Sequence, residues 1–225
     1  MLAELLSNDF SLMRLIVGIV SALVVVFLTL PIHEWAHVFA ATKLGDPTPR
    51  YQGRLTLNPF AHIDYVGALC IILFGVGWAK PVQVNHLNFK NPKRDMALTA
   101  LAGPVSNILM ALVFNIIAYA IWLTVGAPEG IGFYLFLFCD FVVQINVSLA
   151  VFNLIPIPPL DGSRILTAVL PDRTYYKIMQ YERYIYLGFL LLLFTNVLDK
   201  PIMFLSNAIT GLLDLICNGI FKIFL

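Results

Sequence analysis

The sequence predicts a polytopic α-helical membrane protein, and two features of its 225 residues support that prediction. Hydrophobic side chains make up 60% of the chain and charged ones only 12%, against about 45–50% and about 25% in soluble domains. Several apolar runs are also long enough to cross a bilayer. The same composition excludes a disordered chain, and a formal net charge of +1 excludes a nucleic-acid-binding protein with a strongly basic surface.

We expect about five transmembrane helices. The first contains the 18-residue apolar run 15–32 and continues to Lys43; the run alone is about 27 Å long as a helix. Two more helices are expected within 96–125 and 131–155, because each range exceeds the about 20 residues that cross the hydrocarbon core. Two further apolar segments complete the set, at roughly 184–198 and 202–224.

The segments between the first two long spans are expected to be extended or interfacial. Residues 45–64 contain three prolines, and 54–57 alternate polar and apolar side chains, which favours a short membrane-associated strand or hairpin. Residues 81–85 also look extended. The apolar stretch 66–79 has only 14 residues and three glycines, so it suits a re-entrant or interfacial segment better than a full span.

Basic residues indicate the orientation. Of the 14 Lys and Arg residues, 11 fall within 43–95 or 156–183, and none falls within the turn 126–130. Short cytoplasmic loops carry the Lys/Arg excess. We therefore expect a retained first helix with its N-terminus outside, and both basic regions and the C-terminus in the cytosol.

The whole chain, 1–225, is expected to form one integral membrane domain. Within it we expect a core of about 12–170, followed by a pair of helices at about 175–225. The three cysteines lie far apart in apolar runs, without the C-x-x-C spacing of a thiolate metal site. They are therefore interpreted as core side chains rather than as disulfides or metal ligands.

The strongest chemical signal lies in the first span, where residues 33–37 have the sequence His-Glu-Trp-Ala-His. Residues four apart share one face of a helix, so His33 and His37 can bind one metal ion while Glu34 stands beside it to accept a proton from water. Ionisable residues within a membrane segment are costly and mark functional sites. The motif therefore predicts a hydrolytic zinc site. The alternative is two partnered histidines and a glutamate without a metal.

A catalytic zinc ion usually has three protein ligands and one position for water, so a further side chain is needed. The candidates are His62, His86, Asp64, Asp140 and Asp161. Asp161 is favoured, because three preceding prolines end the helix and place this residue on the same side and at a similar depth as the histidines. Asp161 could instead cap the helix that follows it. Asp140 lies in the opposite half of the bilayer and could instead hydrogen-bond Gln144.

Asn153 is a candidate for a second role in catalysis. It lies about one turn before the proline-rich break. Its amide could donate a hydrogen bond to the developing oxyanion, or it could cap the free carbonyl groups at the end of the helix. The sequence leaves both interpretations open.

Taken together, the motifs resemble the site-2 protease family of intramembrane zinc metalloproteases, in the short form without a PDZ or nucleotide-sensing domain. The motifs are HEWAH, GDPTPRYQGRLTLNPFAHID, GWAKPVQVN, ALAGPVSN and FNLIPIPPLDGSRIL. The resemblance implies that one zinc ion is bound by His33, His37 and Asp161, with Glu34 as the catalytic base. It also implies an A-G-P-x-x-N element that packs the next helix beside the site and contains Gly103, Pro104 and Asn107.

The resemblance further implies a substrate and a location. The substrate would be a transmembrane segment of another protein, cut inside the bilayer or at its edge. The enzyme would lie in a bacterial cell membrane with its active site towards the cytosol. Two other functions fit the same residues: a metal transporter or channel that uses the His, Glu and Asp cluster, and an inert relative that binds membrane helices without cutting them.

Overall fold

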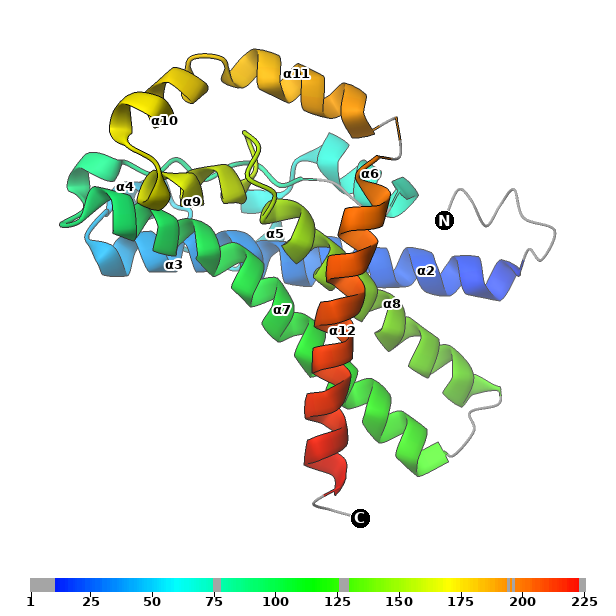
Figure 1. The fold of residues 1–225 in the computed structure, drawn as a ribbon. Coiled ribbons are helices and arrows are strands. Elements are labelled where there is room, and N and C mark those ends of the chain that lie inside the picture. Colours follow the sequence, from blue (N-terminus) through cyan, green and yellow to red (C-terminus); the bar gives the residue numbers. More distant parts are fainter. Residues whose placement is uncertain (1–10, 75–77, 126–129, 194, 196, 223–225) are drawn as a thin grey trace.

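Figure 1 shows the fold in a computed structural model of the chain, which describes residues 11–74, 78–125, 130–193, 195 and 197–222. The described residues are mostly helical, and none of them forms a strand. The elements are α2 (Leu12–Val24), the π-helical η1 (Val25–Thr29), α3 (Leu30–Leu44), α4 (Thr48–Tyr51), α5 (Pro59–His62), α6 (Tyr65–Phe74), the 3₁₀ turn η2 (His86–Asn88), α7 (Pro92–Val125), α8 (Ile131–Asn153), α9 (Asp161–Val169), α10 (Asp172–Met179), α11 (Glu182–Leu193) and α12 (Asp199–Lys222).

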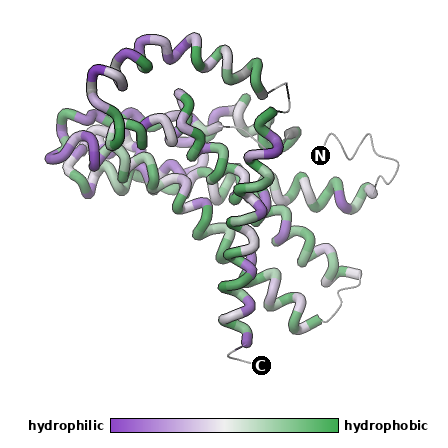
Figure 2. Tube along the Cα trace, in the orientation of Figure 1, coloured by the Kyte–Doolittle hydropathy of each residue, from purple (hydrophilic) through white to green (hydrophobic). Residues whose placement is uncertain are grey.

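Four helical stretches are long and apolar enough to cross a membrane, so the chain is a polytopic helical membrane protein, as predicted. They are Leu12–Leu44, which joins α2, η1 and α3, and the helices α7, α8 and α12. Figure 2 shows hydrophobic residues along α7 and α8 and hydrophilic ones gathered around α4. The expected fifth span is not found among the described residues, because α11 has 12 residues, about 18 Å of helix.

The strands expected at 54–57 and 81–85 are wrong, and the side chain of Arg54 gives the reason. Its guanidinium is buried and donates hydrogen bonds to the carbonyl groups of Ala61, Lys80 and Pro81, the last two at 3.1 and 2.9 Å. A guanidinium carries five N–H donors and can therefore join several loop carbonyls at once. These two segments are held together by one side chain and not by a backbone ladder.

The segment 66–79 returns to the place where it began. The amide of Lys80 donates to the carbonyl of His62 at 2.8 Å. A Cβ atom on Gly67 would lie 1.9 Å from the carbonyl oxygen of Trp78, so the returning chain passes directly against the start of α6. Residues 75–77 lie outside the described part. The segment does not cross as one helix, and its position relative to a bilayer stays a prediction.

A π-helical turn interrupts the first span just before Pro31. The amide of Leu30 bonds the carbonyl of Val25, five residues earlier. Proline has no amide hydrogen and cannot continue the α-helical ladder, and π turns of this kind often occur near functional sites. The turn changes the helix register immediately before His33.

Helix α7 lies at the centre of the fold. It packs against α8 and α3, while α2 packs against α8, and α12 packs against both α7 and α8. One apolar cluster joins the first span to α6 and α8 and includes Val25, Ile71 and Val142. A second joins α7, α8 and α12 and includes Ala111, Val147 and Leu213. The contact between α7 and α3 places the two helices side by side. The proposed division into a core and a C-terminal helical pair stays a prediction.

A buried carboxylate joins two of the loops outside the spans. Asp46 is fully buried and accepts hydrogen bonds from the amides of Thr48 at 3.0 Å and Asn85 at 2.7 Å, and from the side-chain amide of Asn88 at 2.7 Å. Burial raises the pKa of this carboxyl group, but the hydrogen bonds outweigh burial and the pKa lies below its ordinary value. Asp46 therefore stabilises the fold in its charged form.

We expect Asp46→Ala to lower the free energy of unfolding by about 2–4 kcal/mol, because three donors lose a charged acceptor. The pKa of Asp46 is lower when folded than when unfolded, where it is about 3.9. Its contribution is thus present above about pH 4 and is lost as the pH falls through the folded pKa. Thermal unfolding in detergent should show a smaller acid-side loss of Tm in Asp46→Ala than in the wild type. Equal losses would contradict this role.

Candidate metal centre

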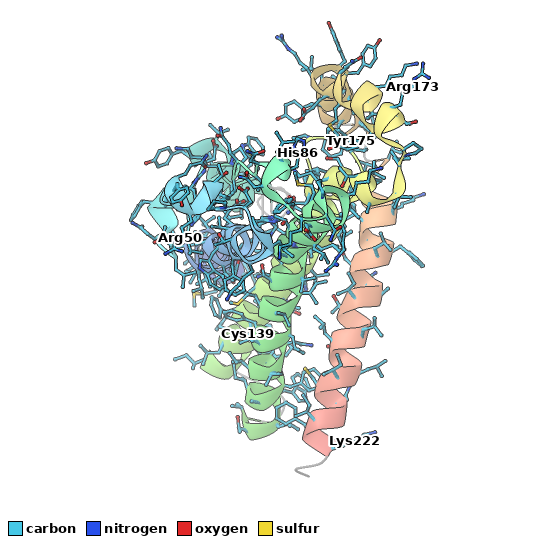
Figure 3. The ribbon with its side chains drawn as sticks, turned by 90° about the vertical axis from the view of Figure 1, so that its left-hand side faces the viewer. Arg50, His86, Cys139, Arg173, Tyr175 and Lys222 are labelled. Atoms are coloured by element: carbon cyan, nitrogen blue, oxygen red, sulfur yellow. The ribbon has the colours of Figure 1, made fainter. Side chains whose placement is uncertain are left out.

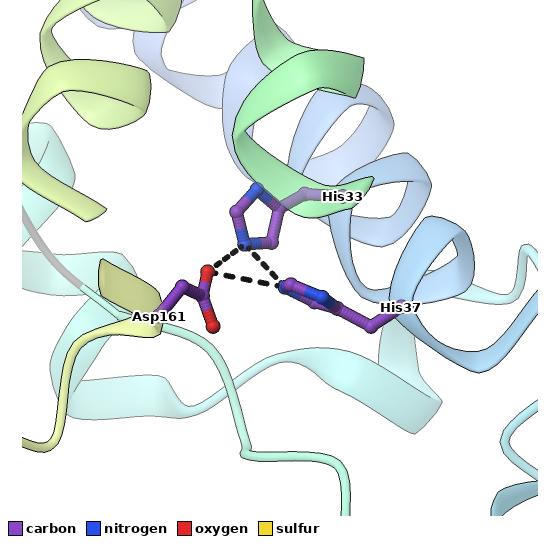
Figure 4. Close-up of side chains that lie close together, drawn as sticks. All are labelled: His33, His37 and Asp161. Carbon is purple, nitrogen blue, oxygen red and sulfur yellow. Dashed lines mark hydrogen bonds and ion pairs between the residues drawn. The ribbon is translucent and has the colours of Figure 1, made fainter. Parts of the chain in front are cut away.

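Three side chains from two distant parts of the sequence meet at one point, as Figure 4 shows. The Nε2 atoms of His33 and His37 are 3.1 Å apart. One carboxylate oxygen of Asp161, Oδ2, lies 3.4 Å from Nε2 of His33 and 3.2 Å from Nε2 of His37. The two histidine residues are only 4% and 7% exposed. Of the candidate ligands in the described part of the chain, only these three form such a group.

These spacings suit a tetrahedral zinc ion. Bonds of about 2.0–2.1 Å from zinc to imidazole nitrogen and carboxylate oxygen place tetrahedral ligand atoms about 3.3 Å apart. The three observed separations lie between 3.1 and 3.4 Å. Nitrogen and oxygen donors are also the ligands that zinc accepts in catalytic sites, where three protein ligands leave one position for water. The residues present therefore fit a zinc ion.

The local sequence explains how Asp161 reaches the histidines. Helix α8 ends at Asn153, and α9 begins at Asp161 itself, with Leu160 as its N-cap residue and no side-chain cap hydrogen bond. A Cβ on Gly162 would lie 2.3 Å from the carbonyl oxygen of Leu154, so glycine lets α9 approach the proline-rich loop closely. The capping role considered for Asp161 is wrong, because Leu160 is the N-cap residue and no side chain caps the helix.

Helix α7 forms the wall beside the two imidazoles. Gly103 lies so close that a Cβ atom there would be 2.3 Å from Nε2 of His37 and 2.6 Å from Cε1 of His33. The carbonyl oxygen of Thr99, one turn earlier, accepts a hydrogen bond from Nδ1 of His37 at 2.7 Å. Such a bond fixes the tautomer and leaves the lone pair of Nε2 for a metal ion. Sequence reasoning missed Thr99, because a backbone carbonyl has no residue-type signal.

The other predicted site residues differ in burial and in their contacts. Glu34 is 7% exposed and interacts electrostatically with His37. Pro104 and Asn107 are buried on α7. Asn153 is the last residue of α8 and is half-buried. Its side-chain amide makes no hydrogen bond among the described residues. Its two possible roles stay predictions.

The remaining candidate ligands have other partners or exposed positions. His62 is fully buried and bonds the carbonyl of Thr56 at 2.7 Å. Asp64 caps the start of α6, and the side chain of Asp140 accepts from Gln144 at 2.7 Å, the alternative considered for it. His86 lies exposed in η2. Of the five candidates, Asp161 is the one that lies against both His33 and His37.

A helical membrane protein in which two buried histidines of an H-E-x-x-H helix meet an aspartate from a distant helix has the features of a membrane metalloprotease. Comparison with known proteins gives the family. Residues 131–195 match the family described as Peptidase family M50. A Bacillus subtilis protein named "Putative zinc metalloprotease YwhC" is 38% identical over 181 residues, which cover 78% of this chain and 81% of that protein. The chain belongs to peptidase family M50, the site-2 proteases, and is a zinc metalloprotease.

Other relatives agree with this membership. The Rip2 proteins of Mycolicibacterium smegmatis and Mycobacterium tuberculosis strain H37Rv carry the same description and are 29% and 31% identical to this chain. The matches cover 77% and 74% of this chain and 66% and 63% of those proteins, so the chain spans slightly less than two thirds of their length. No solved structure matches the chain significantly.

Proposed function

We propose that the chain is an intramembrane zinc protease that hydrolyses peptide bonds in or near the transmembrane segments of other membrane proteins. One observation carries this proposal: His33 and His37, which meet Asp161 in one group, are buried on Leu12–Leu44, a helical stretch long enough to cross a membrane. A substrate must then reach the site from within the bilayer or from its edge. Exposed apolar side chains on the same stretch, such as Phe27 and Phe39, are compatible with a lipid-facing approach.

We assign one zinc ion per chain to His33, His37 and Asp161. A zinc ion bound there supplies a Lewis acid that polarises the peptide carbonyl and lowers the pKa of water. The bond from His37 to the carbonyl of Thr99 holds one imidazole with Nε2 free. Glu34, on the same helix, accepts the proton of the attacking water and returns it to the leaving amine.

We also propose an orientation. The Lys and Arg distribution places the basic regions 43–95 and 156–183 in the cytosol and the N-terminus outside. The four spans found among the described residues, instead of the five expected, change one part of the expectation, because an even number of crossings returns the chain to its starting side. We therefore assign the end of α12 to the outside. Figure 3 shows Lys222, at the end of α12, at the opposite end of the molecule from Arg173, with Arg50 between them in height.

Reporter fusions test this orientation. A reporter that is active only in the cytosol should be active after Arg173 and inactive after Lys222. The complementary reporter, active only outside, should give the reverse pattern. Activity of one reporter at both positions would contradict four crossings and support a further span between them.

Comparison of membrane proteomes tests the proposed function. Cells that produce the wild-type chain or Glu34→Gln should differ in a small set of membrane proteins, whose transmembrane stubs accumulate only with the variant. Each stub that disappears with the wild type identifies a substrate and its cut. Identical fragment patterns, in cells in which both proteins reach the membrane in equal amounts, would contradict intramembrane cleavage.

A further inference from the structure

The second ring nitrogen of His33 lacks a hydrogen-bond partner among the described residues. This nitrogen, Nδ1, is also buried. In Figure 4 this nitrogen lies on the side of the ring away from Asp161 and His37. A histidine that binds a metal almost always donates its other N–H to a carbonyl, a carboxylate or water. His37 follows this rule through Thr99, so His33 needs an equivalent acceptor.

Asn107 is the second unexplained group. Its side chain is 1% exposed, and neither its Oδ1 nor its Nδ2 has a partner among the described residues. A buried carboxamide without hydrogen bonds is costly, and in native proteins nearly all such groups are satisfied by protein or by ordered water. A purely structural role in close packing would be served better by an apolar side chain of the same size.

The helix register places these two groups in the same region. Helices α3 and α7 pack together. His37 bonds the carbonyl of Thr99, and both imidazoles lie against Gly103, one turn further along α7. The two helices are therefore antiparallel, so residues later in α7 lie beside residues earlier in α3. The next turn of α7 carries Asn107. Side chains of a helix lean towards its N-terminus, so the imidazole of His33 leans in the direction of Asn107.

We propose that Asn107 is a positioning residue for His33, an inference that rests on the zinc site of the proposed function. Its carboxamide oxygen holds the Nδ1 proton of His33 through one buried water, because the two groups are not in direct hydrogen-bond contact. A buried water needs about two to four polar partners, which the imidazole and the carboxamide supply. The proton is thereby kept on Nδ1, and the lone pair of Nε2 faces Asp161 and the metal position.

Two isosteric replacements of Asn107 test this role. Asn107→Leu keeps the branched shape of the side chain and removes the acceptor, whereas Asn107→Asp keeps the acceptor. We expect Asn107→Leu to weaken zinc binding by about 10- to 100-fold, measured by competition with a chelator, and to change the absorption bands of the cobalt-substituted protein. Asn107→Asp should stay close to the wild type in both measurements. Asn107→Ala replaces the Leu variant if that variant does not fold.

Asn115→Leu is the matched control. Asn115 is also a buried asparagine on α7, but it lies two turns further along and bonds Asp214 of α12 at 3.0 Å. We expect its loss to lower stability and to leave zinc affinity unchanged. Wild-type affinity and spectrum in Asn107→Leu would overturn the proposal, as would equal weakening by Asn107→Leu and Asn107→Asp. If His33→Ala bound zinc as tightly as the wild type, the proposed zinc site itself would fail.

Discussion

Replacing Glu34 by Gln is expected to lower the rate of peptide hydrolysis by about 10²- to 10⁴-fold, the usual contribution of a general base. The amide has the shape of the carboxylate but cannot accept the proton of the attacking water. Because Glu34 is not one of the three converging side chains, zinc should stay bound. The measurement is cleavage of a transmembrane substrate in proteoliposomes, combined with the zinc content of the same protein.

Glu182→Gln provides a control for this experiment. Glu182 is an exposed carboxylate at the start of α11, and its replacement should leave both rate and zinc content unchanged. Wild-type cleavage by Glu34→Gln would show that another group is the base. Zinc uptake by the vesicles without cleavage of any membrane substrate would instead favour a transporter.

Gly103→Ala is expected to abolish tight zinc binding and to lower activity by about 10²-fold or more, the effect of misplacing reacting groups by about 1 Å. The added methyl group would lie 2.3 Å from Nε2 of His37 and 2.6 Å from Cε1 of both imidazoles. The rings cannot simply swing away, because Nδ1 of His37 is bonded to Thr99 and both Nε2 atoms face Asp161. Zinc affinity and the cleavage rate report the displacement.

Gly211→Ala makes the same chemical change without the clash. Gly211 lies on α12, and a Cβ atom there would meet nothing within 4 Å. Alanine is about 1 kcal/mol more favourable than glycine inside a helix, so this variant should be at least as stable as the wild type and equally active. If Gly103→Ala matched Gly211→Ala in zinc affinity and rate, α7 and the imidazoles could not lie as close as described.

The parts of the site that follow from local geometry could be predicted from the sequence. His33 and His37 share a face because four residues make about one helical turn. Asp161 could be selected because consecutive prolines must end α8 before it. The long spans were evident because crossing a bilayer requires about 20 apolar residues, whereas the apolar segment that contains α11 is not among the four candidate spans of the described residues.

The parts that depend on backbone groups or distant contacts could not be predicted. Alternation around Arg54 resembled a strand, but it reflects one buried cation that bonds three loop carbonyls. The partner of His37 is the carbonyl of Thr99, a group that every residue possesses. Asp46 stabilises loops through residues about 40 positions away in the sequence. Hydrogen-bonding groups of this kind carry no periodicity and no motif of their own.

X-ray absorption at the zinc edge, together with the metal content of the purified protein, tests most directly whether His33, His37 and Asp161 form the catalytic metal site. We expect one zinc ion per chain, bound by two imidazole nitrogens and a carboxylate oxygen at about 2.0–2.1 Å. His33→Ala and Asp161→Ala should lose the ion. Full zinc content in both variants, or sulfur among the ligands of the wild-type ion, would contradict this assignment.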